Sequence, residues 1–435
     1  MSVTSAGRQA LRRGWNLLGR LLPDRPSGRP APPAASTSGD AGRPRVTLLM
    51  GGVYSTGGTT RTALSLAGYL SNHYDVEVVS VNRGRRVPHL PFPPGVKVTA
   101  LDDRFVDQSL RWRLGRRVLS RVPSLLINVD DSRFASFSLW SDLLILRHLR
   151  RVSGVLIATR PGLNILAARF APADVRTIGQ EHMNLGAHRP LLRAAISRYY
   201  PGLDTLAVLT ESDFRDYTAL FTGGRPPVVR RPNAVPTIDG RAGDPESKVV
   251  VAVGRLTPQK GFDLLLPAWV PIAHSHPDWQ LKIYGAGPEK ALLEAQIADL
   301  GLGGQVALMG RTSRIGEAYA SGSIFVLSSR REGLPMVILE AMSKGLPVVS
   351  FDCPTGPAEM VATGENGVLV PNGDVPALTE GLSELIEDRA LRARLGRGAL
   401  GTAARYDQEA IGKEWVELID GLISTPAGGG SPSQV

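Results

Sequence analysis

Short apolar runs alternate with helical patterns along most of this 435-residue chain, and that alternation limits the possible folds more than any other feature. The runs of the first half that we interpret as strands are 46–50, 76–81, 96–101, 154–159, 175–179 and 205–209. After a polar stretch with Pro and Gly at 232–247, the alternation restarts with runs at 248–253, 280–284, 305–309, 323–328, 346–350 and 367–370. Such alternation is typical of parallel sheets covered by helices on both faces. We therefore expect an α/β fold with two domains facing a central cleft, and ligands at the carboxyl ends of the strands.

Composition divides the chain further. We expect a basic tail and disordered linker at 1–45, an N-terminal domain at 46–235, a C-terminal domain with a helical end at 236–421 and a disordered tail at 422–435. Residues 24–45 are rich in Pro, Ala, Ser and Gly, which cannot bury enough apolar surface to fold. Before them, apolar and basic residues at helical spacing indicate either an amphipathic helix on an anionic membrane or a disordered basic tail.

The net charge of +10 is concentrated at the start of the chain, because residues 1–45 hold eight arginines against two aspartates. The remainder is mildly basic, so the high pI is poor evidence for nucleic-acid binding and we expect none. No run of 18 apolar residues predicts a transmembrane helix, and no unbroken apolar core predicts a secretory signal. The single cysteine, Cys353, permits no internal disulfide. This favours a cytoplasmic location, either free or peripheral on the inner face of the plasma membrane.

Two motifs of the first domain indicate a ligand site. The first strand runs into the glycine-rich loop 51–58 (GGVYSTGG) and then a helix, and such glycines let backbone amides approach an anion. The spacing is not GxGxxG and no acid ends the second strand, which disfavours a dinucleotide. Later, 180–184 (QEHMN) places His182 at a strand's carboxyl end, as either a ligand-binding or a structural histidine. The aspartate pairs 102–103 and 130–131 are interpreted as solvated acids rather than metal ligands.

The second domain opens with 249–261 (VVVAVGRLTPQKG), where a buried strand ends at Gly254 and two cations follow. Arg255 and Lys260 flank the loop before the next helix, a position suited to neutralising a diphosphate leaving group. As mere surface cations near a helix start they would oppose the helix dipole, which favours a ligand role. With two such cations, no metal ion is required.

Two acids mark the segment 332–350 (EGLPMVILEAMSKGLPVVS). Glu332 precedes a helix whose first turn suits Pro335, and Glu340 lies inside an apolar part of that helix. Because an unpaired carboxylate there would be costly, we expect Glu340 to accept hydrogen bonds from a polyol such as ribose. We expect Glu332 to reach a sugar ring; the alternative is a helix-entry carboxylate stabilised by the dipole.

A basic segment at 104–126 interleaves six arginines with apolar side chains. This pattern suits anionic lipid headgroups or an anionic polymer. The alternative is a solvated helix whose arginine stems pack down on the surface.

Several pieces occur in a fixed order along the second domain: GRLTPQKG at 254–261, IYGAGPE at 283–289, the segment 310–350 and GENGVLVPNGD at 364–374. This ordered set resembles the family 4 glycosyltransferases, most strongly over 248–374. The resemblance implies the GT-B fold of two Rossmann-like domains, a retaining reaction and a nucleotide-sugar donor, of which UDP-sugars are the commonest. The stretch 351–361 (FDCPTGPAEMV) resembles members that decorate or extend bacterial surface polymers, including teichoic acids.

The resemblance also implies a role for each matching residue. Arg255 and Lys260 would hold the donor diphosphate, Glu332 would contact the transferred sugar, and His182 matches a histidine that the family places beside that sugar. The other donor-binding positions would be Gly57, Gly58, Gly254, Gly310, Arg311, Gly333, Leu334, Pro335, Met336 and Glu340. The family's usual acid shortly after the paired glycines is missing, since Thr59, Thr60 and Arg61 follow Gly58, so the acceptor side of that loop stays unassigned.

The predicted function is transfer of a sugar from a nucleotide-diphosphate sugar, without cofactor or metal, to a cell-surface glycan, a teichoic-acid-like polymer or a lipid-linked acceptor. As the nucleoside diphosphate leaves, Arg255 and Lys260 would stabilise the charge on the departing phosphate. Two alternatives stay open: a nucleotide-sugar epimerase of the same fold, and a non-catalytic module that binds an anionic polymer. The Glu332–Glu340 pair fits a transferase better than an epimerase.

Overall fold

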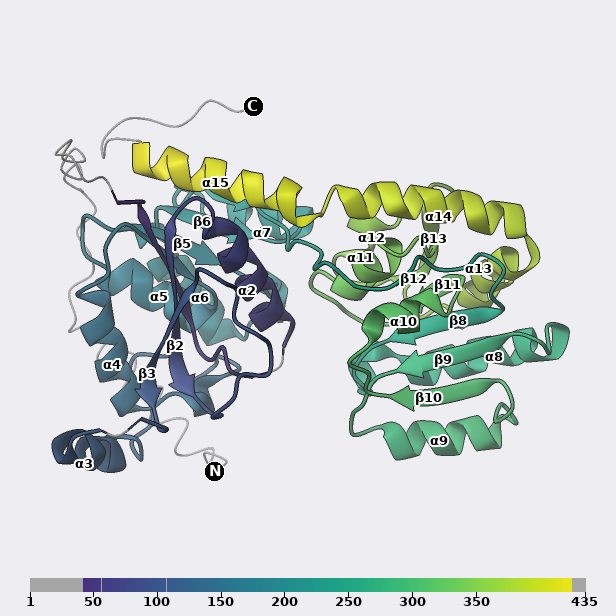
Figure 1. The fold of residues 1–435 in the computed structure, drawn as a ribbon, viewed down its shortest axis with the longest axis horizontal. Coiled ribbons are helices and arrows are strands. Elements are labelled where there is room, and N and C mark those ends of the chain that lie inside the picture. The colour runs from purple at the N-terminus through teal and green to yellow at the C-terminus, as the bar shows by residue number, and fades with distance from the viewer. Residues whose placement is uncertain (1–41, 56, 107, 425–435) are drawn as a thin grey trace. The chain divides into compact units, whose positions relative to one another are not determined.

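The computed structural model of the protein describes residues 42–55, 57–106 and 108–424, which form two units (Figure 1). Unit 1 comprises the described residues up to Leu209, the segment Asp213–Arg231 and the chain from Gly412 onward. Unit 2 comprises Thr210–Ser212 and Pro232–Ile411. Most of the tails predicted at 1–45 and 422–435 lies outside the described residues.

In the described part of unit 1, seven strands form one parallel sheet in the order β3-β2-β1-β4-β5-β6-β7. They are β1 (Arg45–Met50), β2 (Asp75–Arg83), β3 (Lys97–Asp103), β4 (Val155–Ala158), β5 (Arg176–Gln180), β6 (Thr205–Val208) and β7 (Val228–Arg230). The main helices are α2 (Gly58–Leu70), α3 (Leu110–Leu119), α4 (Leu139–Leu149), α5 (Pro161–Phe170), α6 (Pro190–Tyr199) and α7 (Glu211–Leu220). The first six strands confirm the six sequence-predicted runs. The short edge strand β7, whose residues are half-buried or exposed, was not predicted.

Unit 2 repeats the architecture, with six described strands in the parallel order β10-β9-β8-β11-β12-β13. The strands are β8 (Val249–Val253), β9 (Gln280–Tyr284), β10 (Val306–Gly310), β11 (Ile324–Leu327), β12 (Val348–Asp352) and β13 (Gly367–Pro371). The helices are α8 (Phe262–Ser275), α9 (Lys290–Asp299), α10 (Ile315–Ala320), α11 (Met336–Met342), α12 (Pro357–Met360), α13 (Val375–Glu387) and α14 (Arg389–Ala404). All six predicted strands of this half are confirmed, and β8, β9 and β10 are seen side by side in Figure 1.

The central strands of unit 2 are mostly apolar because both faces of the sheet are covered there. On β8, Val250 packs into the core formed with Trp269 of α8, whereas the next residue, Val251, packs into a second core with Phe325 and Leu339. Successive side chains of a strand point to opposite faces, so a continuous apolar run is what such a strand needs. The expected pair of Rossmann-like α/β domains is confirmed.

The last helix, α15 (Gln408–Ser424), returns the chain to unit 1. The Tyr74 hydroxyl donates a hydrogen bond of 2.7 Å to Asp420 Oδ1, and Arg231 Nε donates to the Glu414 carbonyl at 3.2 Å. The sequence analysis predicted that the second domain ends at 421 and that a tail follows from 422. In the structure, residues from Gly412 belong to unit 1, and the helix continues to Ser424. Periodicity shows that a segment is helical but not which core its apolar side meets. Among the described residues, no helix is long and apolar enough to cross a membrane.

Candidate active site

The strand order reverses direction once in each unit, and these two switch points position the candidate residues. In unit 2 the reversal occurs at the adjacent strands β8 and β11. Loops that leave the carboxyl ends of such neighbours run in opposite directions and open a crevice, which is where open α/β sheets bind ligands. The predicted residues Gly254, Arg255 and Lys260 follow β8, and Glu332 follows β11.

The loop after β8 depends on a left-handed glycine. A 3₁₀ turn at Pro258–Lys260 ends at Gly261, whose φ is 64°, and α8 begins at the next residue. A Cβ at Gly261 would lie 2.0 Å from the Ser328 carbonyl oxygen, so no side chain fits there. The loops after β8 and β11 therefore touch through backbone, which places Lys260 beside the Glu332 loop.

Lys260 and Glu332 form an ion pair, although 72 residues separate them in sequence. Lys260 Nζ lies 2.6 Å from Glu332 Oε1, and the Ser329 hydroxyl donates to the same oxygen at 2.6 Å. The two side chains are only 13% and 9% exposed. An ion pair this sheltered from water holds each partner in one position, and removal of either leaves a poorly hydrated charge. The structure thus brings together the predicted phosphate-binding cation and the predicted sugar-binding acid.

A second ion pair, which the sequence did not predict, braces the same two loops. Arg330 donates to both carboxylate oxygens of Asp263, Nη1 to Oδ1 at 2.7 Å and Nη2 to Oδ2 at 2.6 Å. Arg330 Nη1 also donates to the Pro258 carbonyl, and the Gln259 side chain donates to the Arg331 carbonyl. The hydrogen bonds from Arg330 lower the pKa of Asp263, so this carboxylate stays ionised well into the acid range.

If the nucleotide sugar implied by the sequence resemblance is the substrate, we expect Arg330→Lys to reduce its kcat/KM about fivefold, the effect of losing roughly 1 kcal/mol of bidentate pairing. Lysine keeps the charge but cannot hold both oxygens of Asp263, so Lys260 loses part of its support. Steady-state kinetics with varied donor concentration measures the effect. Arg389→Lys is the matched control, because Arg389 pairs with Glu246 at an exposed site. Equal kinetics in the two variants would show that the brace does not position Lys260.

The remaining predicted residues of unit 2 lie along the same sheet edge, but not all of them contact Lys260. Arg255 is exposed, and no acidic side chain among the described residues pairs with it. Gly310 ends β10 and accepts a hydrogen bond of 2.8 Å from the Gly285 amide, and Arg311 beside it is exposed. The segment Gly333, Leu334, Pro335 and Met336 leads into α11, with Pro335 as its N-cap. Gly254 is in close contact with the Lys260 stem, since an added Cβ would lie 3.2 Å from Lys260 Cδ.

Glu340 lies on α11 and is 6% exposed. The hydroxyl of Tyr319, on α10, donates to its Oε2 at 2.8 Å. Sequence reasoning recognised that a carboxylate in this apolar helix needs hydrogen-bond donors, and Tyr319 is one that it did not find. A tyrosine on another helix gives no local signal, because the pairing depends on how α10 and α11 pack. The ribose role of Glu340 stays a prediction.

The one cysteine of the chain lies close to the Lys260–Glu332 ion pair. Cys353 follows β12 and is buried. Burial, with the negative charge of Glu332 second, raises the pKa of Cys353 to about 12. The side chain is therefore a neutral thiol at neutral pH and takes no part in nucleophilic chemistry.

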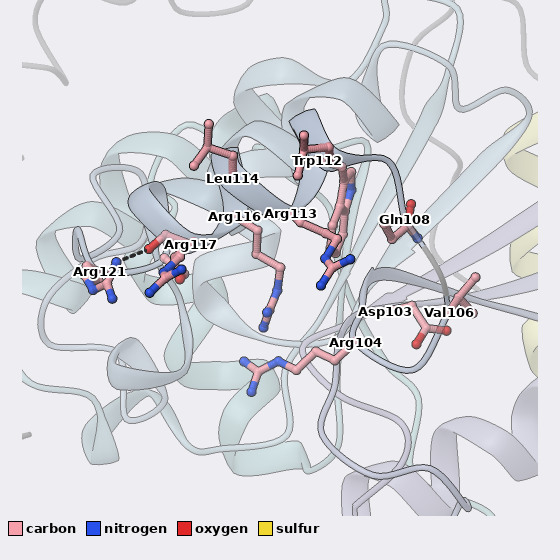
Figure 2. Close-up of a pocket in the computed structure, with 12 residues that line it drawn as sticks. Asp103, Arg104, Val106, Gln108, Trp112, Arg113, Leu114, Arg116, Arg117 and Arg121 are labelled. Atoms are coloured by element: carbon pink, nitrogen blue, oxygen red, sulfur yellow. Dashed lines mark hydrogen bonds between the residues drawn. The ribbon is translucent and has the colours of Figure 1, made fainter.

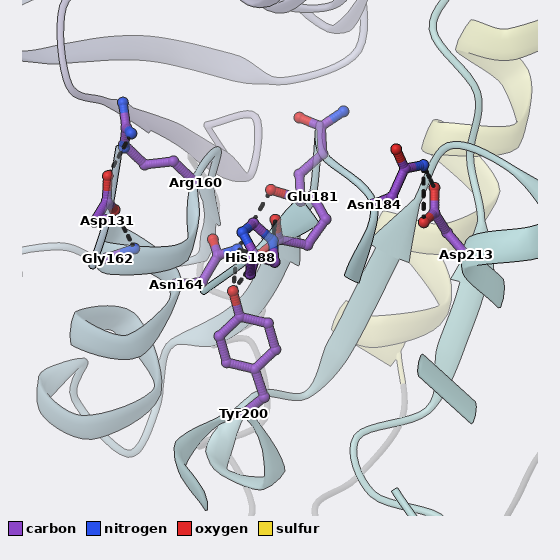
Figure 3. A network of polar contacts seen from close by, with 10 residues as sticks. Asp131, Arg160, Gly162, Asn164, Glu181, Asn184, His188, Tyr200 and Asp213 are labelled. Atoms are coloured by element: carbon purple, nitrogen blue, oxygen red, sulfur yellow. Dashed lines mark hydrogen bonds and ion pairs between the residues drawn. The ribbon is translucent and has the colours of Figure 1, made fainter. Parts of the chain in front are cut away.

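In unit 1 the reversal of strand order occurs at β1 and β4. Gly51 follows β1, and Arg160 follows β4. A Cβ at Gly51 would lie 3.7 Å from Arg160 Nη1, so the loop after β1 lies in van der Waals range of the guanidinium. Arg160 Nη2 donates to Asp131 Oδ1 at 2.7 Å, as Figure 3 shows. The predicted Gly57 and Gly58 form the N-cap and first residue of α2, further along the loop that starts at Gly51.

The interpretation of the aspartate pairs as solvated acids was wrong. Asp131 and Asp130 are 4% and 9% exposed, and Asp102 is 3% exposed. Asp131 also accepts a hydrogen bond from the Gly162 amide, so it fixes Arg160 and the start of α5 together. Arg160 is a functional candidate that sequence reasoning missed; the available signal was a lone cation directly after a buried strand.

His182 follows β5, and Arg160 is close enough to change its ionisation. Its Nε2 atom is buried and has no hydrogen-bond partner among the described residues. Burial, together with the positive charge of Arg160, lowers the pKa of His182 to about 4. The imidazole is therefore neutral at neutral pH. A neutral ring does not repel the nearby Arg160. It has one nitrogen that donates and one that accepts, so it can form a hydrogen bond with a sugar hydroxyl.

The neighbouring Glu181 has a structural role. It is 2% exposed and accepts hydrogen bonds from Tyr200 and Asn164, while His188 Nε2 lies 3.5 Å from its other oxygen (Figure 3). Burial and the Glu181 charge raise the pKa of Tyr200 well above its usual value, so the phenol remains a donor. This buried network fixes the backbone that carries His182.

We expect an NMR titration of the histidine rings to show one ring signal with a midpoint near pH 4 instead of the usual value near 6.5. The same signal should be absent from the spectrum of His182→Gln, which assigns it to His182. Because the folded-state pKa lies below that of the unfolded chain, stability is unaffected above about pH 6.5 and falls as the pH drops from there towards 4. Arg160→Gln should move the midpoint upward, since the guanidinium disfavours the imidazolium. A His182 midpoint near 6.5 would contradict the burial of this ring.

Comparison with known proteins gives a family match for much of unit 2. Residues 238–401 match the model of the glycosyl transferases group 1. The match lies within unit 2, and over this unit the chain resembles the group 1 glycosyl transferases. It is 29% identical to the amylovoran biosynthesis glycosyltransferase AmsD of Erwinia amylovora over 86% of this chain and 99% of that relative. It is 34% identical to an exopolysaccharide phosphotransferase of Streptomyces coelicolor, covering 87% of this chain but only 41% of that longer relative.

Solved structures confirm that the chain has the GT-B fold. A mutant of TarM from S. aureus, in complex with fondaparinux, α-GlcNAc-glycerol and UDP, matches with a TM-score of 0.69 over 88% of this chain and all of that one. Sucrose-phosphate synthase from Thermosynechococcus elongatus matches with a TM-score of 0.70 over 88% and 100%. Both are 16% identical, so they establish the fold alone. The comparisons favour neither the epimerase nor the non-catalytic binding module.

Proposed function

We propose that this protein is a glycosyltransferase that moves a sugar from a UDP-sugar, with retention of anomeric configuration and without a metal ion, to a bacterial surface polysaccharide or its lipid-linked precursor. The observation that carries the proposal is the sheltered Lys260–Glu332 ion pair at the switch point of unit 2. It combines a cation for the departing diphosphate with an acid for the sugar.

The donor diphosphate is assigned to Arg255 and Lys260 after β8. Negative charge builds on the phosphate oxygen as the glycosidic bond breaks, and a fixed ammonium stabilises that charge most where water is excluded. Lys260 meets this requirement. Together with Arg255 it supplies the positive charge that a metal ion would otherwise provide. UDP is the preferred nucleotide because it is bound in the related TarM and in Anabaena HepE structures.

Glu332 is assigned to the transferred sugar, where a carboxylate accepts hydrogen bonds from hydroxyls and offsets positive charge at the anomeric carbon. Retention would follow if the acceptor attacks from the face that the phosphate leaves, with the phosphate taking the acceptor proton. His182, neutral and fixed by unit 1, is assigned to orient the sugar rather than to act as the base. The surface-polysaccharide acceptor rests on AmsD, named for amylovoran biosynthesis.

The test is to incubate the full chain with radiolabelled UDP-glucose, UDP-galactose, UDP-N-acetylglucosamine and GDP-mannose, each with and without a bacterial membrane lipid extract. We expect one UDP-sugar to be hydrolysed slowly alone and transferred faster with the extract, at the same rate in EDTA. NMR of the product should show the anomeric configuration of the donor. Inversion would contradict retention, a loss in EDTA would contradict metal independence, and turnover only with GDP-mannose would contradict the donor assignment. No turnover with any donor would contradict the proposed function.

A further inference from the structure

Helix α3 of unit 1 presents an apolar stripe to solvent. None of its residues is buried. Leu110, Leu114 and Val118 are 80%, 62% and 54% exposed, and Val122, just after the helix, is 38% exposed. A spacing of four residues places these side chains along one side of the helix. A row of exposed aliphatic side chains on a helix marks a surface that contacts something other than water.

The opposite side of α3 holds the helix to its unit. Trp112 packs edge-on against Trp140 of α4, with ring centroids 5.3 Å apart, and Arg116 Nε donates to Asp102 Oδ1 at 2.7 Å. Gly115 allows the close approach, because an added Cβ would lie 3.3 Å from the Trp140 ring. Figure 2 shows Leu114 on the side of α3 away from Arg116. The apolar stripe is therefore held outward by specific contacts and is not a loosely packed core face.

Arginines surround the stripe. A pocket of about 710 Å³ beside α3 is lined by Arg104, Arg113, Arg116, Arg117 and Arg121, several of which are labelled in Figure 2. Its acidic lining residue, Asp103, is already paired with Arg83 at 2.7 Å. Arg104 and Arg116 both pair with Asp102, which leaves three lining arginines without an acidic partner among the described residues. The pocket thus has an excess of guanidinium groups, which bind phosphate oxygens through paired hydrogen bonds.

We propose that α3 docks unit 1 on an anionic phospholipid surface, with Leu110, Leu114 and Val118 at the acyl boundary and the exposed Arg111, Arg113 and Arg117 on headgroup phosphates. Charge complementarity selects an anionic partner, and the apolar stripe selects a bilayer, because a water-soluble polyanion would leave these side chains hydrated. A basic helix lying flat in the interface needs both features on one outward face, as α3 has. None of these residues belongs to the donor site proposed above.

The test is co-sedimentation of the full chain with vesicles of phosphatidylcholine alone or of equal parts phosphatidylcholine and phosphatidylglycerol. The stripe variant is Leu110→Ser/Leu114→Ser/Val118→Ser, and the charge variant is Arg111→Gln/Arg113→Gln/Arg117→Gln; all six positions are exposed. Leu292→Ser/Leu400→Ser and Arg193→Gln/Arg397→Gln are controls at exposed positions elsewhere. Thermal unfolding of each variant verifies that it folds.

We expect the wild type and both controls to bind the anionic vesicles. The charge variant should bind on the order of 100-fold more weakly, since each arginine near an anionic surface contributes about 1 kcal/mol. The stripe variant should lose at least tenfold, with folding intact. If both triple variants bind as the wild type does, α3 is not the docking surface. If the stripe variant alone is unaffected while soluble polyphosphate competes with the vesicles, the surface binds a polyanion and the proposal is overturned.

Discussion

Lys260→Ala is expected to lower kcat by about 100- to 1000-fold, the usual result of removing one preorganised group that stabilises developing negative charge. The reason is specific to this lysine. Its ammonium is 13% exposed and held at 2.6 Å by Glu332, so it needs little reorganisation as the diphosphate departs. Donor turnover at saturating nucleotide sugar measures kcat, and a titration with UDP measures how much of the effect is lost binding.

Two variants separate this role from a general charge effect. Lys248→Ala removes a lysine of the same unit that is 58% exposed and pairs with Asp278, and we expect kcat to change less than twofold. Lys260→Arg keeps the charge but changes the donor geometry, so it should recover only part of the loss. Wild-type turnover in Lys260→Ala would show that the charge on the leaving group is stabilised elsewhere.

The fold could be predicted from the sequence because the central strands of both sheets are buried on both faces. These strands are nearly continuous apolar runs, and the outer strands keep enough apolar residues that six runs in each half predicted β1–β6 and β8–β13 within a residue or two at most ends. β7 was missed because an edge strand of three residues buries too little to show a pattern. The return of α15 to unit 1 was missed because a helix has the same periodicity whichever core it packs against.

The candidate site was predictable where its residues follow strands directly, and not where they depend on pairing. Lys260 and Glu332 lie in loops after β8 and β11, and the strand order makes these loops neighbours. The Arg330–Asp263 brace and the Tyr319–Glu340 hydrogen bond join helices and loops whose contact no local pattern encodes. Asp131 was misinterpreted, and its partner Arg160 was missed, because a charged residue in an irregular segment usually faces water.

Glu332→Ala is expected to reduce kcat/KM by about 100- to 1000-fold and Glu332→Gln by roughly tenfold less than that. Gln keeps an oxygen that accepts from Lys260 Nζ and Ser329 Oγ, as Glu332 Oε1 does, but it lacks the negative charge offered to the sugar. Ala removes the charge and also the partner that holds Lys260. The ratio of kcat/KM between the Gln and Ala variants therefore measures how much Glu332 contributes by positioning Lys260. The loss of kcat/KM in the Gln variant alone measures the contribution of the negative charge near the sugar.

A double-mutant cycle decides whether the pair acts as one unit. If Glu332 acts partly by holding Lys260, then Lys260→Ala/Glu332→Ala should be little worse than either single variant, with a coupling energy of about 1–3 kcal/mol in kcat/KM. Fully additive losses would mean that the two side chains serve the phosphate and the sugar independently. Additive losses would mean that the 2.6 Å ion pair forms only when no donor is bound. Coupled losses would mean that the two side chains still depend on each other while the sugar is transferred.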